Sequence, residues 1–389
     1  MTPPPHRITL FGAGALSLGF LGPELHRDYG LTYVDVAAKA DLLDALRERG
    51  GYTTNMPSPF QAQIAVGNCT GLQAGRDDEA IIQAAAEADI IFTAVGAGNL
   101  KHIAATVATA ARHRCEAGRP VNVLCCENGK DIAANFRAAM QAAGGPLPHA
   151  VHVGDTVMGR MCRIDQPVAP PHAPVAEGLD WGVVGEPIFG IPVRRSEIAD
   201  PHLFSTAFQL CSDAEFGARD DIKTYAHNGT HAFLAFLGHR RGYVEFAEAG
   251  RDAELMALAS QMLQHEIGPA ILGKHTAVVN YGDYQNYAAS LLRRLVCPHF
   301  GDRTDRGVRG ALNKLLPFER FVAGARFIAA AGIRPVLFCR AMAAAVTMCL
   351  GGEAGYRSAD ELLTRHCGLD RQRDALVAEA VHEGLRGLV

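Results

Sequence analysis

The first half of the chain alternates short apolar, β-branched runs with stretches of helical periodicity. Four runs are continuous enough to be strands buried on both faces, at residues 7–11, 31–36, 90–95 and 121–126. Residues 38–49 and 79–87, which lie between these runs, repeat apolar positions at helical spacing. Strands that alternate with helices are typical of a parallel sheet with helical crossovers, so the pattern predicts an α/β domain.

The pattern changes after about residue 196. From there to the end, long alanine- and leucine-rich stretches show helical spacing with few strand-like runs. A chain of 389 residues also exceeds the roughly 250–300 residues that one hydrophobic core usually organises. We therefore predict two domains, an α/β domain over 1–195 and a mainly helical domain over 196–389.

The composition is that of an ordinary globular protein. The formal net charge of −4 gives no electrostatic reason to expect nucleic acid or an anionic membrane as a partner. The late apolar region 327–350 is interrupted by Arg334, Pro335 and Arg340, so no membrane span is expected. The ten cysteines show no framework spacing, as expected of free thiols in the cytoplasm. Small molecules are the expected partners, for a monomer or a small homo-oligomer.

A glycine-rich turn follows the first predicted strand and leads into an apolar helix. We expect Gly12 to allow a tight turn and Gly14 to let the backbone approach a pyrophosphate, which would face the free N–H groups of the helix. Ser17 takes the place of the usual third glycine. The residues expected to bind a dinucleotide in this Rossmann-type turn are Gly12, Ala13, Gly14, Ala15 and Leu16.

Asp35 stands near the end of the second predicted strand, about twenty residues after the turn. A carboxylate there can accept hydrogen bonds from the adenosine ribose hydroxyls and would repel a 2′-phosphate, so we predict NAD rather than NADP as the cofactor. Lys39 is close enough in the sequence to weaken this preference. The alternative role for Asp35 is to cap the following helix.

The third and fourth predicted strands end at residues that should line the crevice where cofactor meets substrate. Val95 and Gly96 are expected to bind the cofactor, because Gly96 would allow the dinucleotide to pass close to the backbone. Asn128 could donate its amide to a substrate oxygen without perturbing a nearby base. Its alternative role is to form a turn before Gly129.

The second predicted domain carries a polar set that suits alcohol oxidation. A helix is predicted to open at Asp220 and to carry three polar residues, Lys223, Asn228 and His231. At about 100° per residue, Asn228 and His231 fall about 140° and 80° from Lys223, which places all three on one side of an α-helix. The reaction needs a base and a donor to the developing alkoxide, and Lys223 and Asn228 can supply them. The lysine must be neutral to act as a base, which burial or another cation would favour.

His231 is expected to hold a neighbouring hydroxyl and to orient the substrate. One alternative for the polar set is a solvated helix face with an incidental histidine. Another is a metal site through the i, i+4 pair His227 and His231. No carboxylate or cysteine at ligand spacing accompanies that pair in the sequence, so we predict no metal.

Four sequence elements, in this order along the chain, carry a resemblance to a known family. They are Leu10-Phe11-Gly12-Ala13-Gly14, Thr93-Ala94-Val95-Gly96, Cys126-Glu127-Asn128 and Lys223-x4-Asn228-x2-His231. The chain resembles the polyol-specific long-chain dehydrogenase family, with the closest likeness to its mannitol-1-phosphate 5-dehydrogenase branch. The resemblance implies an N-terminal Rossmann domain, a mainly helical C-terminal domain and an active site between them. It also implies that Lys223 is the acid/base and that Asn228 and Asn128 form the alkoxide pocket.

Two departures from the family pattern concern the substrate. Met158-Gly159-Arg160-Met161 stands where relatives read something like Val-Asp-Arg-Ile, so an acidic side chain near the site is missing. Asn313 stands where an arginine is usual, in a stretch that resembles the phosphate-sugar branch. In that stretch Arg306, Arg309 and Lys314 could bind a phosphate, or could equally be surface charges or interdomain pairs.

These features predict an NAD-dependent oxidoreductase that interconverts a sugar alcohol, with or without a phosphate, and the ketose, with Lys223 as general acid/base. Within enzymes, the alternative is a sugar-acid or hydroxy-acid dehydrogenase in which Arg309 or Arg294 pairs with a carboxylate. A different class is a non-catalytic dinucleotide-binding sensor. The complete set of Lys223, Asn228 and His231 argues against a sensor, which has no need of all three.

Overall fold

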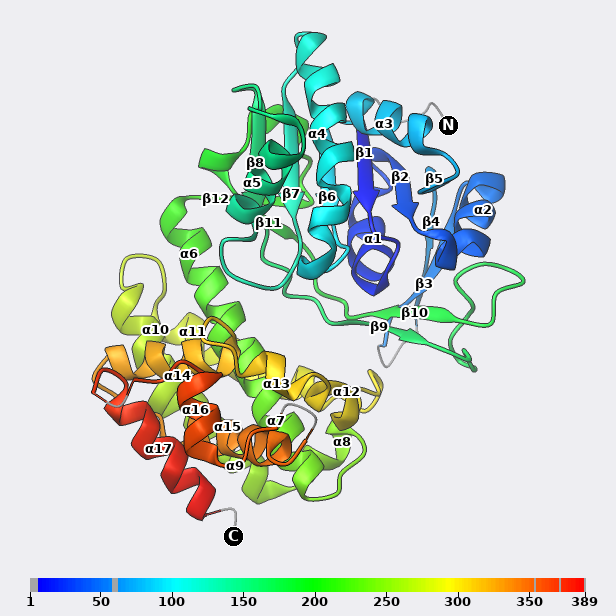
Figure 1. Cartoon of the computed structure of the whole chain (residues 1–389). Coiled ribbons are helices and arrows are strands. Elements are labelled where there is room, and N and C mark those ends of the chain that lie inside the picture. The colour runs from blue at the N-terminus through cyan, green and yellow to red at the C-terminus, as the bar shows by residue number, and fades with distance from the viewer. Residues whose placement is uncertain (1–5, 58–61, 353–354, 371, 388–389) are drawn as a thin grey trace. The chain divides into compact units, whose positions relative to one another are not determined.

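The computed structural model describes residues 6–57, 62–352, 355–370 and 372–387. The chain divides into two compact units, Met1–Phe216 and Gly217–Val389 (Figure 1). The predicted boundary between residues 195 and 196 falls within unit 1, because Ile191–Arg194 (β11) pairs in parallel with Phe208–Cys211 (β12). The first unit therefore extends about twenty residues beyond the predicted limit.

Unit 1 is built on a six-stranded parallel sheet with the strand order β5-β2-β1-β6-β7-β8. The order reverses between β1 and β6, where open α/β sheets bind ligands at the carboxyl ends of their strands. The four predicted strands are present as β1, β2, β6 and β7, and the prediction missed both edge strands. The bounds are His6–Phe11 (β1), Tyr29–Asp35 (β2), Cys69–Gln73 (β5), Ile90–Thr93 (β6), Val121–Cys125 (β7) and Val151–Asp155 (β8).

Both faces of this sheet are buried, as the continuous apolar runs predict. On β1, Leu10 belongs to one buried cluster and Phe11 to another. Residues of α3, α4 and α5 complete the Phe11 cluster, whereas α2 and the helical residues 17–25 complete the Leu10 cluster. The bounds are Ser17–Leu21 (a π-helical segment), Gly22–Leu25 (α1), Ala40–Arg49 (α2), Asp78–Glu87 (α3), Leu100–Glu116 (α4) and Ile132–Gly144 (α5).

A second sheet, with the strand order β4-β3-β10-β9, packs against the helix that follows the glycine turn. A Cβ on Gly19 would lie 2.9 Å from the side chain of Val183 in β10, so a side chain does not fit there. Gly19 thus provides the close helix–sheet packing that the Rossmann motif assigns to its third glycine, whose usual position holds Ser17. The bounds are Tyr52–Asn55 (β3), Gln63–Val66 (β4), Cys162–Asp165 (β9) and Gly182–Gly185 (β10).

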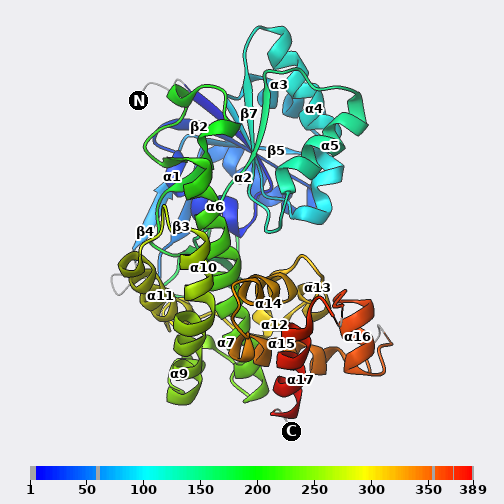
Figure 2. The ribbon, with the colours of Figure 1, turned by 90° about the vertical axis from the view of Figure 1, so that its left-hand side faces the viewer.

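Unit 2 is built from helices (Figure 2), and α7 and α15 supply much of its buried core. Within the described ranges, no helix combines the length and the apolar character needed to cross a membrane. The helix α6 (Asp213–Asp221) contains the boundary between the units. After it come Asn228–Arg240 (α7), Phe246–Ala249 (α8), Ala253–Met262 (α9), Gly268–Lys274 (α10), Tyr281–Leu295 (α11), Thr304–Val308 (α12), Ala311–Lys314 (α13), Arg320–Ala330 (α14), Val336–Cys349 (α15), Ala359–Arg365 (α16) and Ala375–Arg386 (α17).

The start of α7 packs tightly against Phe338 of α15. A Cβ on Gly229 would lie 2.8 Å from the Phe338 ring, and a Cβ on Gly324 of α14 would lie 2.5 Å from it. The buried Glu266 caps α15, because its carboxylate accepts the N–H groups of Leu337 (2.7 Å) and Phe338 (2.8 Å). These contacts hold the first turn of α7, which carries two of the candidate catalytic residues.

Candidate active site

Gly12 makes the turn at the end of β1. Its φ of +103° favours glycine, and a Cβ there would lie 2.4 Å from the backbone oxygen of Ala94. Gly14 differs, because a Cβ on it would meet no heavy atom within 4 Å. The space beside Gly14 is therefore open to a bound group, as the Rossmann motif requires.

The helix after the turn presents free N–H groups. Its first hydrogen bond runs from the Leu18 N–H to the Gly14 oxygen (3.0 Å), so the amides of Ala15 and Leu16 have no acceptor within the helix. Such amides and the positive end of the helix attract an anion. The turn and the open space at Gly14 therefore fit the pyrophosphate of a dinucleotide.

Asp35 binds the glycine turn directly. One carboxylate oxygen accepts the N–H of Ala13 (2.7 Å) and the other accepts the N–H of Val36 (2.7 Å). The 3₁₀ segment Ala37–Lys39 that follows has no side-chain cap, so capping is not the role of Asp35. The carboxylate instead joins the ends of β1 and β2, and each oxygen retains a lone pair that a ribose hydroxyl can use.

Lys39 makes a contact that the sequence pattern did not predict. Its ammonium lies 4.3 Å from the centre of the Trp181 ring, which is a cation–π contact. This contact engages the one nearby cation that the sequence offered for a 2′-phosphate. The charge that faces the end of the glycine turn is then the carboxylate of Asp35.

Glu127 joins the ends of β6 and β7, although the sequence pattern did not single it out. Its carboxylate accepts the Thr93 hydroxyl (2.7 Å) and the Val95 N–H (3.0 Å). Gly96 follows with a φ of +87° and is exposed. Asn128 is also exposed, so its amide is accessible to a ligand. The sequence feature that could have identified Glu127 is its place as an acidic residue directly after a buried strand.

The candidate catalytic helix begins earlier than predicted. The start at Asp220 is wrong, because α6 begins at Asp213 and continues through a π-helical segment, Ile222–His227, into α7. Ser212 and Glu215 form the N-terminal cap: the Glu215 carboxylate accepts the Ser212 N–H (2.8 Å), and Ser212 Oγ accepts the Glu215 N–H (3.3 Å). The Ser-x-x-Glu capping box was the sequence signal for this start.

The α-helical angles predicted for the polar set do not apply within the π-helical segment. Hydrogen bonds in a π-helix join residues five apart, so residues i and i+5 lie one above the other. Lys223 Nζ accordingly donates to Asn228 Oδ1 at 2.8 Å, where an α-helix would separate the two residues by about 140°. The contact between Lys223 and Asn228 is therefore a product of the π-helical turn.

Positive charges surround this segment. Burial lowers the pKa of His227 well below its ordinary value, and the charges of Lys223 and Arg294 lower it further. His227 is thus a neutral core histidine beside the polar set.

Among the described residues, no group of three or more His, Cys, Asp and Glu side chains could hold a metal ion, so the pair His227 and His231 has no third ligand there.

His231 is paired with an acidic residue far along the chain. Its Nε2 lies 3.1 Å from Asp302 Oδ2, and Arg306 donates to the same carboxylate through Nε (2.7 Å) and Nη2 (2.6 Å). Burial opposes ionisation of Asp302, but the hydrogen bonds from His231 and Arg306 outweigh it and hold the pKa of Asp302 well below its ordinary range. The carboxylate is therefore charged at neutral pH.

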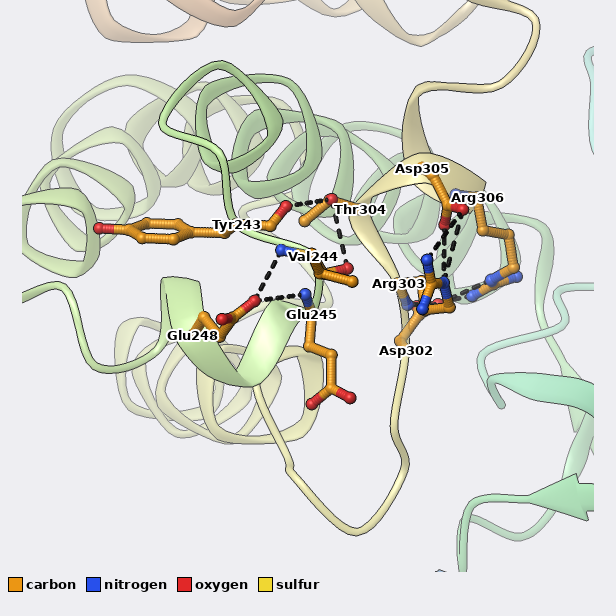
Figure 3. Close-up of polar contacts among 9 residues, drawn as sticks. All are labelled: Tyr243, Val244, Glu245, Glu248, Asp302, Arg303, Thr304, Asp305 and Arg306. Carbon is orange, nitrogen blue, oxygen red and sulfur yellow. Dashed lines mark hydrogen bonds and ion pairs between the residues drawn. The ribbon is translucent and has the colours of Figure 1, made fainter. Parts of the chain in front are cut away.

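Two loops hold Asp302 in place (Figure 3). Thr304 Oγ1 donates to the backbone oxygen of Tyr243 (2.6 Å). The Phe246 N–H donates to the backbone oxygen of Asp302 (2.9 Å). The Phe246 ring stacks on the His231 ring with the centroids 4.6 Å apart. Asp302 thus lies at the edge of the His231 ring, and Phe246, the first residue of α8, covers one face of it.

The three predicted phosphate ligands have different surroundings. Arg306 is committed to Asp302 by two hydrogen bonds, whereas Arg309 is exposed. Lys314 donates to the backbone oxygen of Arg309, and burial together with the Arg320 charge lowers the pKa of Lys314 to about 8. Arg320, which the sequence pattern did not single out, has a buried Nε that makes no hydrogen bond among the described residues but lies 3.6 Å from Glu319 Oε2.

Two family models match the chain. The mannitol dehydrogenase Rossmann domain matches residues 6–179, and the mannitol dehydrogenase C-terminal domain matches residues 220–385. The chain belongs to the mannitol dehydrogenase family. This membership confirms the predicted resemblance, the predicted fold class and the predicted class of enzyme, a polyol dehydrogenase with a Rossmann domain.

The chain is similar along most of its length to proteins named mannitol-1-phosphate 5-dehydrogenase. The protein from Shouchella clausii is 30% identical over 337 residues, which cover 84% of each chain. The protein from Arthrobacter sp. is 27% identical over 341 residues, or 86% of this chain and 84% of the relative.

A solved structure has a similar fold. It is Pseudomonas fluorescens mannitol 2-dehydrogenase in ternary complex with NAD and D-mannitol, with a TM-score of 0.76 and 17% sequence identity. The match covers 100% of this chain and 92% of that chain. The predicted cofactor, NAD, is the dinucleotide bound in that complex.

Proposed function

We propose that this polyol dehydrogenase oxidises a secondary alcohol of a hexitol or hexitol phosphate to the ketose, reversibly and with NAD. The observation that carries the proposal is the 2.8 Å contact between Lys223 Nζ and Asn228 Oδ1. It places a proton acceptor beside an amide that can donate to an oxygen anion, which is the pair of functions that alcohol oxidation requires.

Lys223 takes the hydroxyl proton in the oxidative direction and returns it in the reductive direction. Its Nζ donates a hydrogen bond to Asn228 Oδ1, and this contact orients the amine. The Asn228 side chain accepts through Oδ1, which leaves its amide N–H groups to stabilise the developing alkoxide. Asn128, exposed at the end of β7, is proposed as a second donor.

The residues of the glycine turn would hold NAD, which supplies the hydride acceptor when it is bound. Gly14 and the amides of Ala15 and Leu16 would receive the pyrophosphate, and Gly96 would allow close passage of the dinucleotide. Asp35 would bind the ribose hydroxyls and repel a 2′-phosphate. The contact of Lys39 with Trp181 supports NAD over NADP, because it engages the nearest competing cation.

The basic residues of unit 2 support a phosphorylated substrate. Lys314 feels the positive charges of Arg320, Arg306 and Arg309, and Glu319 is the acidic residue whose charge opposes them. Since Arg306 is already paired with Asp302, we propose that Arg309, Lys314 and Arg320 contribute most to binding a phosphate. The relatives named mannitol-1-phosphate 5-dehydrogenase support this assignment.

The experiment that tests the proposal is an NADH-oxidation screen with fructose, fructose 6-phosphate, related ketoses and keto sugar acids. Wild type is compared with Lys223→Ala and with Lys101→Ala, an exposed lysine of α4 that serves as the control. We expect a loss of about 10²–10⁴-fold in kcat for Lys223→Ala and no change for Lys101→Ala. Turnover of none of these substrates by a protein that binds NAD normally would remove the enzymatic proposal.

Two further arms of the screen test the finer assignments. Preference for a keto sugar acid would favour the sugar-acid alternative, with Arg309 or Arg294 on the carboxylate. Asp35→Ala should improve the use of NADP relative to NAD, and an unchanged ratio would count against the ribose role. We also propose that the enzyme is cytoplasmic, which its ten free thiols support. We propose that it works as a monomer or small homo-oligomer.

A further inference from the structure

The carboxylate of Asp302 is fully used by hydrogen-bond donors. Oδ1 accepts Arg306 Nε (2.7 Å) and the Arg303 N–H (2.8 Å). Oδ2 accepts Arg306 Nη2 (2.6 Å) and lies 3.1 Å from His231 Nε2. The residue is 3% exposed, so water does not compete for these positions. Each oxygen thus has two partners, which is its capacity.

The partners of Asp302 determine where His231 carries its proton. A guanidinium and a backbone N–H can only donate, and the three bonds from Arg306 and Arg303 favour the charged carboxylate. Together with the pKa of Asp302 well below its ordinary range, they leave the carboxylate ionised at neutral pH. An ionised carboxylate next to His231 Nε2 can only accept from it. The proton of the neutral imidazole therefore lies on Nε2, and the lone pair lies on Nδ1.

The rest of the surroundings keep the His231 ring neutral and fixed. Burial lowers its pKa, although the hydrogen bond with Asp302 opposes this effect. Phe246 covers one face of the ring, and Gly307 lies against its edge, since a Cβ on Gly307 would be 3.4 Å from His231 Cε1. Nδ1 has no hydrogen-bond partner among the residues that the structure describes.

We infer that Asp302 is a positioning residue that fixes His231 as the Nε2–H tautomer, so that Nδ1 accepts a hydrogen bond from a substrate hydroxyl next to the carbon that is oxidised. This inference rests on the proposed function for its substrate. It assigns opposite roles to the two ends of the polar set, because Nδ1 of His231 accepts whereas the Asn228 amide donates.

The opposite roles specify how a substrate is oriented. A ketone oxygen can only accept, so it binds at Asn228 and Lys223 and is rejected by Nδ1 of His231. A neighbouring hydroxyl can donate, so it suits Nδ1. The site therefore places the carbonyl of a ketose beside the lysine and distinguishes it from the adjacent hydroxyl group.

The tautomer is tested by nitrogen NMR of protein labelled with ¹⁵N-histidine, without substrate. The sixteen histidines require an assignment, which the loss of one signal set in His231→Gln provides. The wild type should show a protonated Nε2 and an unprotonated Nδ1 for His231 at neutral pH. A protonated Nδ1 in the wild type overturns the inference, and this result needs no other variant.

Asp302→Asn should reverse the tautomer. The amide oxygen of the asparagine should take the Oδ1 position, because both partners of Oδ1 can only donate, whereas His231 beside Oδ2 can change its tautomer and accept. Arg306 Nη2, which donates to Oδ2 in the wild type, loses its acceptor in this variant. The asparagine NH₂ group then faces His231 Nε2 and donates to it, which moves the ring proton to Nδ1. Asp305→Asn is the matched control, since Asp305 is exposed and pairs with Arg303 rather than with His231. A folded Asp302→Asn protein that keeps the wild-type tautomer overturns the inference.

A kinetic comparison separates positioning from a structural role. Hexitols that lack one or the other hydroxyl next to the oxidised carbon should lose roughly tenfold to a hundredfold in kcat/KM with the wild type. Asp302→Asn, whose Nδ1 no longer accepts, should discriminate less than about threefold between the same substrates. Equal discrimination by both proteins contradicts the inference. Failure of the Lys223 experiment would remove the proposed function but leave the tautomer measurement intact, so the two failures are distinguishable.

Discussion

The substitution Asn228→Asp tests the proton-transfer role of Lys223 by replacing the side-chain amide of residue 228 with a carboxylate. The substitution keeps the shape of the side chain and adds a negative charge 2.8 Å from Lys223 Nζ. A negative charge favours the protonated ammonium, so a higher pH is needed to produce the neutral amine. Polyol oxidation requires the neutral amine, and its pH profile should therefore move to higher pH.

The size of the shift follows from the distance. Two unit charges 2.8 Å apart interact by about 1.5 kcal/mol in water and by about 6 kcal/mol at an effective dielectric constant of 20. With about 1.4 kcal/mol per pKa unit, these limits correspond to about one and four units. Because Asn228 is only partly buried, we expect about one to three units. Loss of the amide donor should also lower kcat in both directions, by about 10²–10³-fold.

The assay is the pH dependence of kcat/KM for polyol oxidation and for ketose reduction. The oxidative limb of Asn228→Asp should rise at higher pH than in the wild type, and ketose reduction should persist to higher pH, since it needs the protonated lysine. Gln264→Glu adds the same charge at an exposed position of unit 2 and should leave both profiles unchanged. An oxidative limb that stays in place, or moves to lower pH, would refute the assignment of Lys223 as the base.

Two more predictions concern the neighbourhood of the polar set. Lys314 has a pKa of about 8 and loses its charge above that pH, so the KM for a phosphorylated polyol should rise above pH 8. Lys314→Arg keeps the charge and should remove this rise. A KM that does not depend on pH in the wild type would exclude the phosphate role of Lys314. Gly307→Ala places a Cβ 2.5 Å from that of Ala235 and 3.4 Å from His231 Cε1, so it should cost about 1–3 kcal/mol in thermal unfolding and raise KM. Gly273→Ala, in open space on α10, should instead stabilise the fold by up to about 1 kcal/mol, and equal effects of the two substitutions would contradict the packing argument.

The central part of the Rossmann sheet could be predicted because its strands are buried on both faces and read as continuous apolar runs. The missed strands β5 and β8 stand at the two edges of the sheet. Their sequences include Thr70, Gln73 and His152, because an edge strand does not have to be apolar throughout. A hydrophobic pattern detects the centre of such a sheet more readily than its borders.

The residues of the glycine turn could also be predicted, because their roles depend on neighbours in the sequence. The acidic partners of the site could not. Asp302 reaches His231 across 71 positions of the chain, and Glu127 joins two strands that are adjacent only in the folded sheet. No spacing rule connects such pairs, since the contacts are made by the tertiary fold.

The change from π-helix to α-helix at Asn228 explains how Lys-x4-Asn-x2-His can act as one unit. The five-residue interval from Lys223 to Asn228 matches a π-helical turn, and the three-residue interval from Asn228 to His231 matches neighbouring positions of an α-helix. A purely α-helical segment would turn Asn228 away from Lys223. The change of helix type occurs directly before Gly229, which packs against Phe338 without room for a side chain. Tertiary packing, rather than helical propensity, therefore accounts best for where the helix changes type, and α-helical periodicity alone gave Lys223 and Asn228 the wrong relative angle.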